Sequence, residues 1–156
     1  MVIGLLFLNL KNRWLTNYKL NTENRLPILT GSPASPGIAT GPVKIIYSPK
    51  EISKVKSGDI LVAPMTNPDY VPAMKKAVAI VTDRGGRTSH AAIVSRELGI
   101  PAIVGTDKAT KILVNDMIVS VNGLTGEIFK GKITIHPQGE HAQKSHPAGG
   151  QARNLY

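Results

Sequence analysis

Three short apolar runs alternate with helical patterns in the middle of the chain, and this alternation most constrains the fold. The runs span residues 59–63, 78–82 and 102–104 and consist mainly of Val, Ile and Ala. Stretches with helix start and stop signals separate them, at 67–77 and at about 89–98. Short continuous apolar runs are typical of strands buried on both faces. Their alternation with helices indicates an α/β core.

Antiparallel elements are expected on either side of this core. Residues 41–47 have the pattern of a strand, and a short helix suits 50–57. Residues 117–121 and 126–129 flank the turn Asn122-Gly123-Leu124-Thr125, a combination typical of a hairpin. The chain therefore predicts an α/β fold with a mixed sheet in layers, and not a purely parallel sheet.

The length of 156 residues predicts one structured domain with additional segments at both ends. A Gly- and Pro-rich boundary at 31–37 places this domain at residues 31–131, after an N-terminal arm or linker at 1–30. Residues 132–156 predict a flexible tail. The apolar stretch Met1–Leu10 is too short to span a bilayer, which needs about 20 residues. We expect it to pack on the domain or on a partner, with no role at a membrane.

Composition and charge exclude several classes of function. The chain contains no cysteine, which rules out a disulfide framework, a thiolate nucleophile and cysteine-ligated zinc, and is compatible with a cytoplasmic protein. The formal net charge of +9 is spread along the sequence, without a dense basic run or interleaved aromatic residues. A solvated basic surface fits this distribution better than a nucleic-acid-binding site.

His90 is the histidine best placed for chemistry. It follows the glycine pair Gly85-Gly86 and the hydroxyl residues Thr88 and Ser89, and a helical pattern begins directly after it. Free backbone N–H groups and the positive end of the dipole favour bound anions at a helix N-terminus. The glycines let the backbone approach a phosphate, and the hydroxyls can cap the helix or contact the phosphate. A neutral imidazole there could attack phosphorus.

The surroundings of His90 give further expectations. Arg87 is a candidate electrostatic contributor, if its side chain turns inward. Ala91 and Ala92 are small and are expected to leave room for another protein surface near the imidazole. Val94 and Leu98 lie four residues apart and are expected to face the core. Arg96 and Glu97 are expected to face solvent.

Other interpretations of this region remain open from the residue types alone. A Ser-His pair after a Gly-Gly turn is also compatible with a helix cap that has no activity. No metal site is expected, because His90 has no histidine or carboxylate at ligand spacing. His136, His141 and His146 recur every five residues, which does not stack them on one helical face. A serine hydrolase is not supported, because no Gly-x-Ser-x-Gly elbow is present.

A longer motif resembles a known family. Residues 85–101, Gly-Gly-Arg-Thr-Ser-His-Ala-Ala-Ile-Val-Ser-Arg-Glu-Leu-Gly-Ile-Pro, are similar to the phosphohistidine swivelling domain of phosphoenolpyruvate-utilising enzymes. Upstream matches lie at 35–39, 58–62 and 65–69, and the stretches 66–69 and 71–74 most resemble phosphoenolpyruvate synthase (pyruvate, water dikinase). Downstream, residues 104–105 and 121–123 also match, so the resemblance covers about residues 30–131.

The resemblance implies a fold and a function. The family fold is a compact layered β/β/α domain, and the family pattern places the phosphorylated histidine on His90. Thr88 matches a regulatory phosphorylation site of some relatives. The domain itself would bind no cofactor. Mg²⁺ and ATP belong to partner domains, an ATP-grasp nucleotide-binding domain and a barrel that binds pyruvate or phosphoenolpyruvate, in cis or in trans.

The resemblance leaves the acceptor of the phosphoryl group open. A phosphoenolpyruvate synthase-like reaction is the leading hypothesis, and this chain alone should not complete it. The same mobile domain also serves enzyme I-like systems, pyruvate phosphate dikinase and antibiotic phosphotransferases. A non-catalytic interaction module that keeps the fold is the alternative of a different class.

Overall fold

The computed structural model describes residues 18–20, 26–133 and 135–137, in two compact units. The larger unit spans Arg25–Lys132. In the smaller one, β1 (Tyr18–Leu20) pairs antiparallel with β10 (Ile135–Pro137). The apolar N-terminal stretch and the residues beyond 137 lie outside the described part, so the expectations about them stay predictions.

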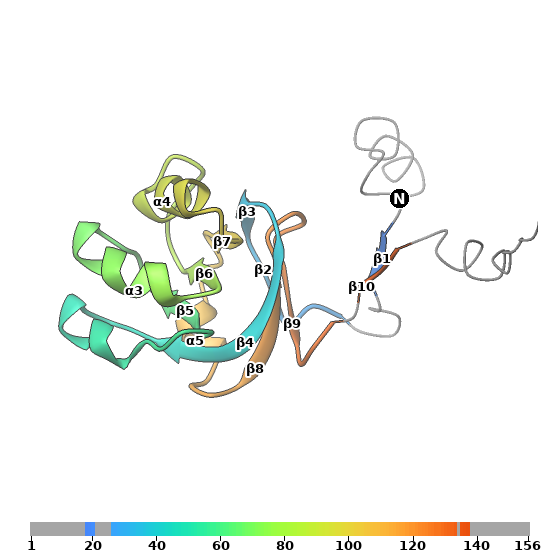
Figure 1. Ribbon diagram of the computed structural model, residues 1–156, viewed down its shortest axis with the longest axis horizontal. Helices are drawn as coiled ribbons and strands as arrows, with labels where there is room; N and C mark the ends of the chain where they lie inside the picture. The colour runs from blue at the N-terminus through green and yellow to red at the C-terminus, as the bar shows by residue number, and fades with distance from the viewer. Residues whose placement is uncertain (1–17, 21–25, 134, 138–156) are drawn as a thin grey trace, which may run out of the picture. The chain divides into compact units, whose positions relative to one another are not determined.

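The described residues of the larger unit form eight strands and five short helices, and Figure 1 shows their arrangement. In chain order these are β2 (Leu29–Thr30), β3 (Ser32–Ser35), β4 (Ile38–Ile45), the 3₁₀ helix η1 (Pro49–Lys54), β5 (Ile60–Ala63), the 3₁₀ helix η2 (Pro68–Tyr70), α3 (Val71–Lys76), β6 (Ala79–Thr82), α4 (His90–Leu98), β7 (Ala102–Val104), α5 (Ala109–Ile112), β8 (Ile118–Asn122) and β9 (Glu127–Lys130).

The strands of the larger unit form one mixed sheet of eight strands in the order β2-β9-β8-β4-β5-β6-β7-β3. Strands β4, β5, β6 and β7 run parallel to one another, and the pairs at either side of them are antiparallel. β2 and β3 are consecutive in sequence but occupy opposite ends of this order. The sheet therefore curls round on itself, and the chain crosses between its ends at Gly31, whose N–H donates to the carbonyl of Gly126 at 2.8 Å.

The sheet separates two apolar clusters, because successive side chains of a strand point to opposite faces. In β5, Leu61 and Ala63 join the cluster beneath the helices, whereas Ile60 and Val62 join the one between the two halves of the curled sheet. α3 and α4 cover the first cluster (Figure 1). The result is a layered β/β/α arrangement, which confirms the predicted α/β class with a mixed sheet.

The region predicted as a turn-rich boundary forms strands instead. Ser32–Ser35 is β3 and pairs antiparallel with β7, and β2 precedes it at Leu29–Thr30. The prolines of this segment argued against a strand, because proline has no N–H to donate to a neighbouring strand and is tolerated in sheets only at edges or bulges. β3 ends the strand order, so Pro33 has a ladder partner on one side only.

Two helical predictions also need correction. The helix expected over 67–77 divides into η2 and α3, although Asn67 caps it as expected by accepting the N–H of Asp69. Pro72 has no N–H to donate to Pro68, so the first turn closes as a 3₁₀ helix with Val71 donating there instead. The short helix α5 was not predicted, because four residues give no recognisable periodicity.

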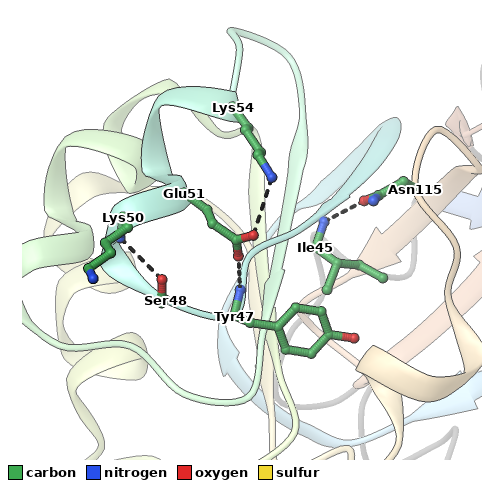
Figure 2. Close-up of polar contacts among 7 residues, drawn as sticks. All are labelled: Ile45, Tyr47, Ser48, Lys50, Glu51, Lys54 and Asn115. Atoms are coloured by element: carbon green, nitrogen blue, oxygen red, sulfur yellow. Dashed lines mark hydrogen bonds and ion pairs between the residues drawn. The ribbon is translucent and has the colours of Figure 1, made fainter.

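A local hydrogen-bonded cap follows β4 (Figure 2). Ser48 caps η1 by accepting the N–H of Lys50, and the Glu51 carboxylate turns back to accept the N–H of Tyr47 at 2.8 Å. Lys54 contributes an ion pair with Glu51 at 3.2 Å. The Tyr47 N–H, and secondarily Lys54, hold the pKa of the Glu51 carboxyl below its ordinary value of 4.5.

We expect an NMR titration to find the Glu51 pKa below 4.5 in the folded chain. Because the folded-state pKa is lowered, the stabilisation is complete above the unfolded-state value and disappears as the pH falls through the folded one. In Lys54→Met the pKa should rise only part of the way, since the Tyr47 N–H is the larger cause. A pKa at or above 4.5 in the unsubstituted chain would contradict this account.

Candidate functional site

α4 begins at His90, within one residue of the start that its sequence signals predicted. Ser89 is the N-cap, and its Oγ accepts the N–H of Ala92 at 3.4 Å and donates to the carbonyl of Gly86 at 2.7 Å. The helix ends at Leu98 before Gly99, which has a left-handed conformation. These two caps confirm the predicted helix and place the imidazole in its first turn.

The loop before α4 connects the end of β6 to the helix cap. Gly85 has a φ of 113°, a conformation open to glycine and strained for other residues. Thr82 donates its hydroxyl to the carbonyl of Arg84 at 2.7 Å and so fixes the beginning of the loop. The backbone from 84 to 88 is exposed, which leaves it accessible to a bound anion.

Thr66 contacts the imidazole, and sequence analysis had treated it only as part of the family match. Its Oγ1 lies 2.8 Å from Nδ1 of His90. Thr66 follows β5, whereas His90 follows β6, and these neighbouring strands are parallel. Their carboxyl ends therefore meet at one edge of the sheet, where sites in α/β folds collect. Thr66 is buried, so its hydroxyl is held in place against the half-exposed ring.

This contact gives the two ring nitrogens of His90 different roles. If Nδ1 carries the proton and donates to Thr66, Nε2 keeps a free lone pair. Within the described part of the chain, Nδ1 is the ring nitrogen that makes a hydrogen bond. The arrangement can therefore fix the tautomer in which Nε2 is the nucleophile.

The prediction that Ala91 and Ala92 leave open space near the imidazole is wrong. Both side chains are buried against the sheet, together with Ser95. Small residues on this face allow the helix to pack closely on the strands beneath it. Ile93 is the exposed apolar residue of this turn, and Met65, beside Thr66, is also exposed.

The other predicted site residues lie around the loop with different surroundings. Gly86, Arg87 and Thr88 are all exposed, and the Arg87 side chain has no contact with the imidazole among the described hydrogen bonds and ion pairs. Gly86 has open space where a Cβ would stand. Among residues 85–89, the described hydrogen bonds at the start of α4 are those that Ser89 makes with Gly86 and Ala92.

The nearest acidic residue of the loop, Asp83, is held by a different element. Its carboxylate accepts the N–H of Thr110 at 3.0 Å and the hydroxyl of the same residue at 2.6 Å. The side chain is therefore committed to α5, and it ties the end of β6 to that short helix.

Neither a metal cluster nor a membrane-spanning helix occurs in the described residues. Across 18–20, 26–133 and 135–137, no three His, Asp or Glu side chains are grouped as ligands of a metal ion. In the same residues, every helix is too short or too polar to cross a bilayer.

Comparison with known proteins finds a family that matches part of the chain. Residues 55–126 match the family described as PEP-utilising enzyme, mobile domain. A probable phosphoenolpyruvate synthase of Archaeoglobus fulgidus is 64% identical over 106 residues, which are 68% of this chain and 14% of that protein. The phosphoenolpyruvate synthase of Pyrococcus furiosus is 65% identical over 104 residues, 67% of this chain and 13% of that protein. The resemblance predicted from the motif is confirmed.

The chain spans about one seventh of the length of the curated relatives that it matches, at 13–14% of each. A solved structure, holo aconitase X of Thermococcus kodakaraensis, is similar with a TM-score of 0.52 and 23% identity, covering 67% of this chain and 98% of that one. At this identity the likeness concerns the fold alone.

Proposed function

We propose that this chain carries a phosphoryl group on Nε2 of His90, on the premise that residues 55–126 match the mobile-domain family of phosphoenolpyruvate-utilising enzymes. The observation that carries the proposal is the 2.8 Å contact between Thr66 Oγ1 and Nδ1, at the N-terminus of α4. A helix cap with no chemical role would need only the Ser89 hydroxyl. A second residue that fixes the imidazole from a neighbouring strand supports a chemical role for the ring.

The groups in the site can account for each bond made and broken in phosphoryl transfer to His90. The Nε2 lone pair attacks phosphorus, and the bond from phosphorus to the donor oxygen breaks, with its electron pair leaving on that oxygen. The ring is cationic until Nδ1 releases its proton to solvent, and the Thr66 hydroxyl serves as the hydrogen-bond partner of Nδ1. The N-terminus of α4, together with Gly85, Gly86, Thr88 and Ser89, favours the charge of the bound phosphoryl group.

The other parts of the reaction belong to partners. We place this chain in a phosphoenolpyruvate synthase-like reaction in the cytoplasm, in which it takes a phosphoryl group at a nucleotide-binding domain and delivers it at a pyruvate-binding barrel. The length of the curated relatives supports additional domains in cis. Mg²⁺ and ATP would be bound by those domains. Arg87 and Thr88, exposed beside His90, are candidates for electrostatic support and for regulation.

The experiment that tests this function supplies the missing domains. A phosphoenolpyruvate synthase relative whose own matching histidine is replaced by alanine, here called the donor enzyme, is mixed with this chain and labelled phosphoenolpyruvate. We expect acid-labile, base-stable label on this chain. The isolated mobile domain of that relative is the positive control. If the control is labelled and this chain is not, the chain is a non-catalytic module and the proposal is wrong.

Thr66→Val is expected to slow labelling by the donor enzyme about tenfold, because one hydrogen bond of ordinary strength orients the ring. Valine keeps the shape of threonine, so the fold should persist. Thr66→Ser, which restores the hydroxyl, is the matched control and should recover most of the rate. Equal rates in the valine variant and the unsubstituted chain would show that the contact does not orient the imidazole.

A further inference from the structure

Arg96 joins two parts of the fold that are distant in sequence. Its guanidinium donates from one terminal nitrogen to the carbonyl of Ala34 at 2.8 Å. The other terminal nitrogen donates to the carbonyl of Arg87 at 2.6 Å. Sequence analysis expected this residue to face solvent. Its side chain does lie at the surface, but both terminal nitrogens of the guanidinium donate to backbone carbonyls.

The first of these carbonyls belongs to an irregularity in β3. The pairing of β3 with β7 places Pro33 opposite Ile103 and Ser35 opposite Ala102, so that Ala34 is skipped. At a bulge, one residue is left outside the ladder and its polar groups need another partner. The guanidinium of Arg96 supplies that partner, and the bulge in turn fixes the position of the guanidinium.

The second carbonyl belongs to the loop that precedes His90. Arg87 lies three residues before it, between the exposed glycines and the Ser89 cap. At its other end, the loop is fixed by the Asp83 carboxylate on Thr110. Arg96 therefore holds the end of the loop nearest to the histidine.

We propose that Arg96 is a positioning residue for His90, and that it couples the bulge of β3 to the loop in front of the imidazole. The proposal rests on the proposed function only in its consequence for phosphoryl transfer. The planar guanidinium presents several donors in a fixed geometry, which allows one side chain to bridge two carbonyls. A lysine at this position has one flexible ammonium group and would favour one carbonyl at a time.

The test uses the full chain with the variants Arg96→Ala and Arg96→Lys. Glu97→Ala, an exposed neighbour on the same helix, is the control for the site, and Ile128→Val, buried in β9, is the control for lost stability. Amide exchange is followed by NMR at Ser89, whose N–H donates to the Gly86 carbonyl, and at core strands for comparison. Labelling by the donor enzyme is measured in parallel.

We expect Arg96→Ala to accelerate exchange at Ser89 about tenfold relative to the core strands and to slow labelling about tenfold, because a charge-assisted hydrogen bond is lost from the loop. Arg96→Lys should be intermediate, and Ile128→Val should change only global stability. If Arg96→Ala lowers stability but leaves the Ser89-to-core ratio and the labelling rate unchanged, Arg96 is merely structural and the proposal fails. If the unsubstituted chain takes no label, the proposed function fails, and the exchange ratio alone decides whether Arg96 holds the loop.

Discussion

Replacing His90 with alanine is expected to abolish acid-labile label on the chain. The imidazole is the group that would form the bond to phosphorus, and the described neighbours Thr66 and Ser89 carry only hydroxyls in hydrogen bonds. Alanine is a good helix former, and the ring is only half buried, so the fold should survive the substitution. The measurement is the transfer assay with the donor enzyme, with unfolding followed in parallel.

The matched control for this prediction removes the other imidazoles. A variant with alanine at positions 136, 141 and 146 retains His90 as the single histidine of the chain. It should accept label at the rate of the unsubstituted chain. Label that persists in His90→Ala, or that is lost from the triple variant instead, would place the phosphoryl group elsewhere and overturn the proposed function.

Gly123→Ala is expected to damage folding strongly, because backbone atoms occupy the space that the added methyl group would need. Gly123 follows β8, and its N–H donates to the carbonyl of Gly37 at 2.7 Å. A Cβ at this position would overlap the carbonyl oxygen of Ser35 and would also meet Ala102 N and Pro101 Cβ, both at 3.2 Å. Because backbone blocks the space, strands must move apart. Overpacking of this kind costs about 1–3 kcal/mol, and for a domain of this size lowers Tm by roughly 4–8 °C per kcal/mol.

Gly86→Ala is the control for the Gly123 prediction. No atom lies within 4 Å of a Cβ at Gly86, and its backbone is outside the left-handed region. Its thermal unfolding should stay close to that of the unsubstituted chain, since alanine also reduces the freedom of the unfolded state. If Gly123→Ala unfolds at the same temperature as Gly86→Ala, the strands at this junction are more yielding than their contacts indicate.

Features with local causes were the ones that sequence could predict. α4 is specified by a capping serine, by a glycine after its last turn and by a proline two residues beyond that glycine, all within thirteen residues. The buried strands β5, β6 and β7 are short apolar runs and were placed within one residue of their bounds. The chemistry of these signals does not depend on the rest of the chain.

Features with distant causes were missed. The contact between Thr66 and His90 joins residues 24 positions apart, and it exists only because β5 and β6 are parallel neighbours. The orientation of α4 was also mistaken in part. Val94 and Leu98 do pack on the core, but only partly buried, while Ala91 and Ala92 form the deepest part of the interface. Large apolar residues dominate a periodicity argument, whereas close packing on a sheet favours small ones.

The pairing of β2 with β9 brings the two ends of the larger unit together, which affects how such a unit can be inserted into a longer polypeptide. Leu29 lies opposite Ile128 in antiparallel strands, so the incoming and outgoing segments of the larger unit leave the sheet side by side. A unit whose two ends are neighbours can be inserted into a host chain at a single loop without separating the flanking residues. The same topology allows the unit to be deleted or exchanged as a whole, because only a short distance then separates the two ends of the host chain.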